Sequence, residues 1–184
     1  MKKLQVEAEV FVLAPAQLVY EIVADYRKGH LQILPKGYFS ALEVEQGGTG
    51  AGTIICFKML VFGLTRTFRV AITEPEPGRV LAETDSSSGI ETTFTISPLE
   101  GSQLTKVTIA TRFPTRGGIF GPLERFFTSR TLRSIYNQEL QLLNALARLT
   151  PADATVGDDF PQHSGMMSLT RAMYLYISPD ARLW

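Results

Sequence analysis

The sequence lacks several features that mark whole classes of protein. Its 184 residues include one cysteine, Cys56, and two histidines, His30 and His163. A lone cysteine cannot form a disulfide within the chain, and two histidines are few for a zinc site or a histidine-based catalytic triad. We therefore expect a reducing, cytoplasmic setting and no metal site.

Net charge and long apolar runs are also missing. The 18 Lys and Arg residues balance the 18 Asp and Glu residues, which removes the overall attraction to phosphate that nucleic-acid binding needs. The longest nearly apolar stretch, Ile54 to Leu64, holds Lys58 and is far shorter than the roughly 20 residues of a membrane-spanning helix. We expect no nucleic-acid partner and no stable membrane insertion.

A glycine-rich segment at residues 48–52 is the one feature that suggests a nucleotide cofactor. A dinucleotide-binding loop must lead into the N-terminus of a helix. Here the segment leads into a run of Ile and Phe that is typical of a strand. We therefore interpret it as a hairpin turn and expect no cofactor.

What is present is a regular order of strand and helix patterns. Residues 4–13 alternate apolar and polar, and Pro15 begins a short amphipathic helix to about Asp25, with one or two further turns within 27–34. Residues 123–149 contain no Gly or Pro and predict one long helix. Between these helices lie six runs rich in Val, Ile, Thr and Phe, near 39–46, 51–62, 64–74, 79–85, 90–97 and 103–113. Their short separators predict a sequential antiparallel meander in an α+β domain.

The end of the chain differs in composition. Residues 150–165 are rich in Pro, Asp and Gly, and 166–177 return to apolar residues. We expect a domain at 1–149 and, at 150–184, a linker with a short apolar tail helix. Because the 51–62 strand is apolar on both faces, we expect the tail to cover its outer side or the mouth of a cavity, on its own chain or on a second copy. A homodimer through this strand or the tail is an alternative to a monomer.

Two segments carry a resemblance to a known superfamily. Residues 14–26 (APAQLVYEIVADY) and 137–143 (NQELQLL), together with the order of elements over residues 4–149, resemble the helix-grip or START-like superfamily. Its members include polyketide cyclase/dehydrase-like and lipid-transport proteins. The resemblance implies a curved seven-stranded antiparallel sheet around a long C-terminal helix, with two short helices between the first two strands. It also implies a cavity that commonly holds an apolar or amphipathic molecule.

Strand alternation indicates which side chains face such a cavity. The expected lining is Phe57, Met59, Phe68, Val70, Phe94, Ile109, Thr111, Phe113, Phe126 and Phe127. Each of these is as well explained as an ordinary core residue, so the prediction concerns the set.

Polar residues near the expected cavity are the candidates for chemistry. Arg66 shares the alternating face of Phe68, and we expect it at the cavity mouth. Glu139 falls among apolar residues on the helical projection, where a carboxyl group favours its acid form. The alternative is that Glu139 reaches solvent or pairs with Arg66, Arg69 or a tyrosine. Tyr26 and His30 lie where the short helices meet, so an acid-base site is conceivable there.

The leading hypothesis from the sequence is binding or transport of a small hydrophobic or amphipathic ligand in an internal cavity. A second is a polyketide cyclase- or dehydratase-like enzyme that uses Glu139, Tyr26 or His30 for proton transfer. A third is a module that regulates or chaperones another protein through the tail or a sheet edge. Whether the protein is an enzyme stays open.

Overall fold

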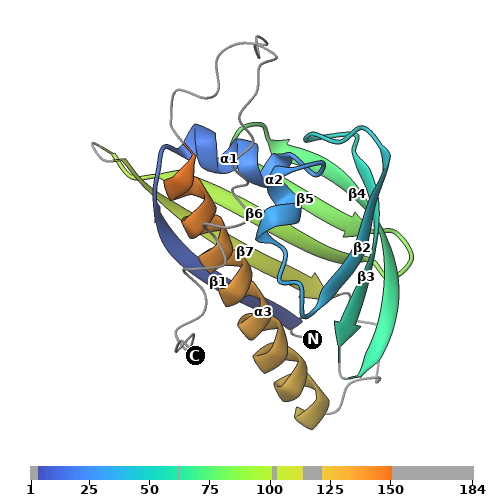
Figure 1. Ribbon diagram of the computed structural model, residues 1–184. Coiled ribbons are helices and arrows are strands. Elements are labelled where there is room, and N and C mark those ends of the chain that lie inside the picture. The colour runs from blue at the N-terminus through green and yellow to red at the C-terminus, as the bar shows by residue number, and fades with distance from the viewer. Residues whose placement is uncertain (1–3, 62, 101–102, 114–121, 151–184) are drawn as a thin grey trace, which may run out of the picture.

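The computed structural model describes residues 4–61, 63–100, 103–113 and 122–150, and of residues 4, 61 and 122–128 it describes the backbone alone. The elements follow the predicted order (Figure 1). They are β1 (Leu4–Leu13), α1 (Ala16–Ala24), α2 (Gly29–Ile33), β2 (Phe39–Gln46), β3 (Ile54–Val61), β4 (Leu64–Glu76), β5 (Val80–Asp85), β6 (Ile90–Pro98), β7 (Leu104–Phe113) and α3 (Pro122–Leu149).

The seven strands form one antiparallel sheet in the order β1-β7-β6-β5-β4-β3-β2. The sheet curves, and α3 lies along its concave side with α1 and α2 at one end (Figure 1). This is the helix-grip fold that the sequence predicted. The third strand begins at Ile54 and not at residue 51, because Gly50 and Gly52 take positive φ angles of 58° and 82° in the turn.

The core lies between the inner face of the sheet and α3. Period-two alternation places Val107 and Ile109 of β7 inward, and the helical repeat places Ile135, Leu140 and Leu143 of α3 against the sheet side; all five are at most 1% exposed. The main contacts of α3 are with β1, followed by α2 and α1. The helix therefore covers the β1 side of the sheet.

The outer side of β3 is less apolar than the sequence suggested. Arg69 of β4 forms an ion pair with Glu45 of β2, with Nε and Oε2 2.7 Å apart, and this pair bridges over the strand between them. Cys56 of β3 is half-buried. The tail at 150–184, which we expected to cover this surface, lies outside the described residues beyond Thr150. Of the helices that the structure describes, none is both long and apolar enough to span a membrane.

Candidate functional site

The corner between α1 and α2 is held by one carboxylate. Asp25 accepts hydrogen bonds from the backbone N–H groups of Arg27, Lys28 and Gly29 at 3.0, 3.1 and 3.2 Å, and its own carbonyl accepts the N–H of His30 at 2.7 Å. A Cβ on Gly29 would lie 2.5 Å from the carbonyl oxygen of Ile22, so the two helices approach too closely for any other residue. The corner therefore fixes the position of the side chains that follow Asp25.

Tyr26 and His30 lie side by side in the interior. Tyr26 is 0% and His30 is 2% exposed, and their rings stack with centroids 4.4 Å apart. The Nδ1 atom of His30 lies 2.7 Å from the carbonyl oxygen of Val23. Because a carbonyl oxygen only accepts, Nδ1 carries the hydrogen and Nε2 faces away from Val23.

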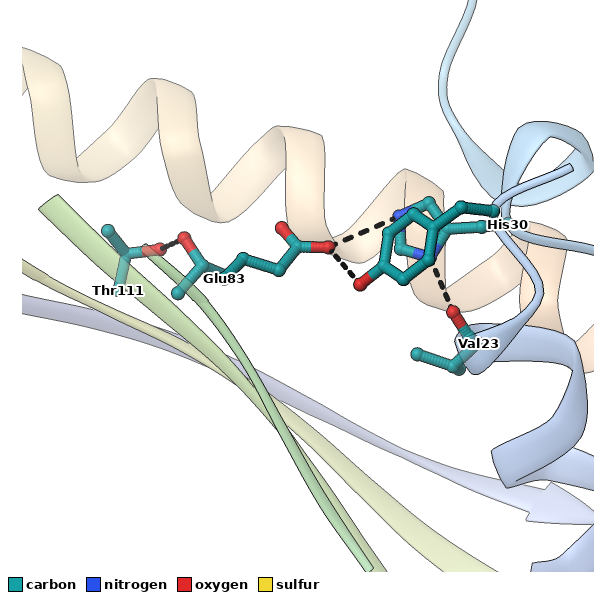
Figure 2. Close-up of polar contacts among 6 residues, drawn as sticks. Val23, His30, Glu83 and Thr111 are labelled. Carbon is teal, nitrogen blue, oxygen red and sulfur yellow. Dashed lines mark hydrogen bonds and ion pairs between the residues drawn. The ribbon is translucent and has the colours of Figure 1, made fainter. Parts of the chain in front are cut away.

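Glu83 of β5 connects these two side chains. Its Oε1 accepts a 2.7 Å hydrogen bond from the Tyr26 hydroxyl and lies 3.6 Å from Nε2 of His30. Figure 2 shows the carboxylate of Glu83 pointing toward the ring of His30. The Glu83 side chain is only 12% exposed. Burial, and then the charge of Glu83, raises the pKa of Tyr26 well above its usual value, so Tyr26 remains a hydrogen-bond donor.

A row of hydroxyl groups continues from Glu83 across the sheet. Glu83 pairs in register with Thr92 of β6, and Thr92 with Thr111 of β7. The two threonine hydroxyls lie 2.7 Å apart, and Thr111 also hydrogen-bonds with the hydroxyl of Tyr136 on α3. Burial raises the pKa of Tyr136. The inner face thus carries one polar stripe that links the sheet to α3.

Glu139 points into the interior from α3, as the helical projection predicted. It is 4% exposed, and within the described residues its Oε1 has no hydrogen-bond partner. Burial raises its pKa well above 4.5, and the negative charge of Glu83 raises it further. The alternative of a solvent-facing or arginine-paired Glu139 is wrong, because Arg66 and Arg69 are exposed and Arg69 pairs with Glu45. Glu139 is a buried carboxyl group that favours its acid form.

The expected lining divides into three groups. Five members are buried: Met59, Val70, Phe94, Ile109 and Thr111. Three are half-buried: Phe57, Phe68 and Phe113. The side chains of Phe126 and Phe127 lie outside the described part of the chain.

Arg66 is exposed near the start of β4. The first four residues of β4, from Leu64, are all exposed, although Met59, which pairs with Arg66 on the neighbouring strand, is buried. An exposed guanidinium is compatible with the expected position at a cavity mouth, and that position stays a prediction.

Three aromatic rings on the β2–β4 side form a half-buried cluster. The ring of Phe57 lies 5.6 Å from that of Phe39 and 5.5 Å from that of Phe68, centroid to centroid. Phe57 and Phe68 share the inward faces of Ile55 and Val70, which are buried. Because α3 packs chiefly on β1, this part of the inner face keeps apolar surface exposed to solvent.

Glu83, Thr92 and Tyr136 were not among the sequence candidates. Two signals were available for Glu83: it lies two residues after the apolar Leu81, and the hairpin register places it across from Thr92, which shares the face of Phe94. Alternation alone would have placed Glu83 inward. Its contact with Tyr26 depends on the curvature of the sheet, which no local pattern encodes.

A family model described as polyketide cyclase / dehydrase and lipid transport matches residues 3–148. The chain belongs to this family. A comparison with curated proteins gives no match. The family supports binding of a small ligand or cyclase-type chemistry in general, and does not decide between them.

Solved structures share the fold. The aromatase/cyclase ZhuI from Streptomyces sp. R1128 is 22% identical, with a TM-score of 0.65. The alignment covers 84% of this chain and 100% of the ZhuI chain. A START superfamily protein from Mycobacterium smegmatis is 17% identical, with a TM-score of 0.61 and coverage of 81% and 100%. The KanY protein is 23% identical, with a TM-score of 0.69 and coverage of 80% and 99%. At these identities the likeness concerns the fold.

Proposed function

We propose that the protein binds a small, largely apolar molecule between the sheet and α3, with one polar group of that molecule hydrogen-bonded to Glu139. The observation that carries the proposal is the buried oxygen of Glu139 that has no partner in the described residues. Leaving a buried polar atom unpaired costs about 1 to 3 kcal/mol. A ligand that supplies the missing hydrogen bond recovers that free energy.

The half-buried aromatic cluster of Phe39, Phe57 and Phe68 supports a route for such a molecule. These rings lie on the inner face, where an apolar guest gains by leaving water. The family, whose description includes lipid transport, agrees with a ligand of this kind. We propose that the molecule enters over these rings and places its polar end near Glu139.

The experiment is a thermal-shift panel with fatty acids, quinones, flavonoids and polyketides. A ligand at 100 times its Kd stabilises the native state by about 2.7 kcal/mol, so at least one class should raise the melting temperature clearly. No shift with any class would contradict the proposal.

A pair of adjacent residues provides the variants for this test. Phe68→Asp places a charge on the inner face and should weaken binding. Thr67→Asp places the same charge on the neighbouring exposed residue, which faces the other way, and should leave the shift unchanged. If both variants bind equally well, the route over Phe68 is wrong.

The contact of Tyr26, Glu83 and His30 favours a second candidate, a cyclase- or dehydratase-like enzyme. Glu83 faces a hydroxyl donor and an imidazole nitrogen, and Glu139 favours its acid form. Such groups supply and remove protons when an aldol adduct loses water. The catalysed loss of water from a bound β-hydroxy ketone, detected by mass, would favour this candidate. Recovery of every bound ligand unchanged would favour a carrier.

A further inference from the structure

Two carboxyl groups face the described interior. Glu83 and Glu139 are both carboxyl groups on the concave side of the sheet, and they interact electrostatically. The structure describes eleven Lys and Arg side chains as exposed, and one more, Lys106, lies on the outer face in an ion pair with Glu9. No described Lys or Arg therefore offers a cation to Glu139.

The described titratable groups that interact with Glu139 come from three parts of the fold. Glu83 comes from β5, Tyr26 from the corner between α1 and α2, and Tyr136 from α3. His30 of α2 is the one basic side chain within this described cluster, and its Nε2 faces Glu83. A protonated His30 would neutralise Glu83 and would still leave Glu139 without a cation.

This distribution of charge discriminates between ligand head groups. A carboxylate next to Glu139 would add an anion to a buried region that already holds Glu83, and a buried charge without a partner is strongly disfavoured. An ammonium group would be attracted to both carboxyl groups and would donate hydrogen bonds to Oε1 of Glu139, which has no partner among the described residues.

We infer that the molecule bound in the interior is an apolar amine, whose ammonium group pairs with Glu139, and that carboxylic acids of the same shape are excluded. The inference rests on the proposed function and specifies its ligand class. When the ammonium group binds, the carboxyl group of Glu139 ionises and its proton passes to solvent, so that one ion pair replaces one neutral acid. Amine binding therefore releases protons, and binding of a neutral ligand does not.

The test uses three probes with one apolar body: naphthylethylamine, naphthylethanol and naphthylacetate. Binding to the full chain is measured by titration calorimetry at neutral pH, in two buffers that differ in ionisation enthalpy. We expect the amine to bind about tenfold or more tightly than the alcohol, as one added charge pair in a buried site allows, and the acetate not to bind. The amine enthalpy should differ between the buffers, and the alcohol enthalpy should not.

Two variants assign the effect to the named carboxyl groups. Glu139→Gln keeps the shape of a neutral acid and should remove both the amine preference and the proton release, while the alcohol still binds. Glu83→Gln removes the second charge and should reduce the preference. Glu9→Gln, on the outer face of β1, makes the same change of net charge as Glu83→Gln. It should alter neither the amine preference nor the proton release.

Each outcome decides the inference. Equal binding of the three probes, or preference for the acetate, would overturn the amine assignment and leave the proposed binding function intact. Failure of all three probes would overturn the amine assignment. The proposed function fails as well only if the thermal-shift panel also gives no response.

Discussion

The hydroxyl of Tyr26 donates a 2.7 Å hydrogen bond to Glu83, a residue 57 positions later in the chain. This contact joins the helical corner to the middle of the sheet. Both side chains are largely buried, so the carboxylate depends on protein donors more than on water. The same hydrogen bond therefore stabilises the fold and sets the environment of the Glu83 carboxylate in the interior.

Replacing Tyr26 with Phe tests the strength of that contact. Hydrogen bonds to charged groups contribute about 1.5 to 3 kcal/mol, whereas neutral ones contribute about 0.5 to 1.5 kcal/mol. Tyr26→Phe should lower the free energy of unfolding by the amount expected for a bond to a charged group, about 1.5 to 3 kcal/mol. Urea denaturation measures this loss. Tyr136→Phe removes a neutral bond to Thr111 and is the matched control. Equal losses in the two variants would show that the bond between Tyr26 and Glu83 is no stronger than a neutral one.

The acid form of Glu139 predicts an unusual pH dependence. The pKa of this carboxyl group is raised in the native state above its ordinary value of 4.5. Between 4.5 and the native pKa, the unfolded chain loses a proton that the native chain keeps. The contribution to stability is therefore complete below pH 4.5 and falls by up to about 1.4 kcal/mol per pH unit as the pH rises.

Glu139→Gln should remove this slope. The difference in unfolding free energy between the natural chain and the variant, measured by urea denaturation at successive pH values, isolates Glu139 from the other acidic groups. Glu9→Gln, which changes an exposed residue of β1, should keep the slope of the natural chain. A difference that does not change with pH would show that Glu139 is solvated.

The strands were predictable from sequence because burial of one face imposes a period of two. In β1 the side chains of Val6, Ala8 and Val12 are buried and those between them are not, and the sequence alone shows this alternation. The rule does not predict exposure: Arg66 is exposed, although Val70 on the same face of β4 is buried. Alternation gives the face of a residue, and only the extent of the core decides whether that face is covered.

The site was only partly predictable for a related reason. Glu139 could be identified from the sequence because the apolar residues that surround it on α3 lie within one or two helical turns of it in the chain. Glu83 was missed, because its partners Tyr26 and His30 reach it across the interior. A contact of that kind depends on how far the sheet bends and on the angle of the helical corner. Both are tertiary properties that single-sequence patterns do not contain.

Gly29 offers a test of how the corner positions the site. A Cβ at this residue would lie 2.5 Å from the backbone oxygen of Ile22, and forcing such a contact costs about 1 to 3 kcal/mol. Gly29→Ala should lower the unfolding free energy by that amount and shift the NMR signals of His30, which follows directly. Gly37→Ala, where nothing lies within 4 Å of the added atom, is the control. Matching behaviour of the two variants would show that the helices separate freely.

Asp85 predicts a pH dependence of the opposite sign. Burial alone would raise its pKa, but hydrogen bonds from Ser88 and Ser87 outweigh burial and lower the pKa below 3.8. The carboxylate therefore stabilises the native state above pH 3.8, and this contribution is lost as the pH falls through the native pKa. Asp85→Asn should be less stable than the natural chain at neutral pH, with the difference shrinking in acid. Urea denaturation from neutral pH downward measures it, and a gap that widens in acid would contradict the hydrogen-bonded carboxylate.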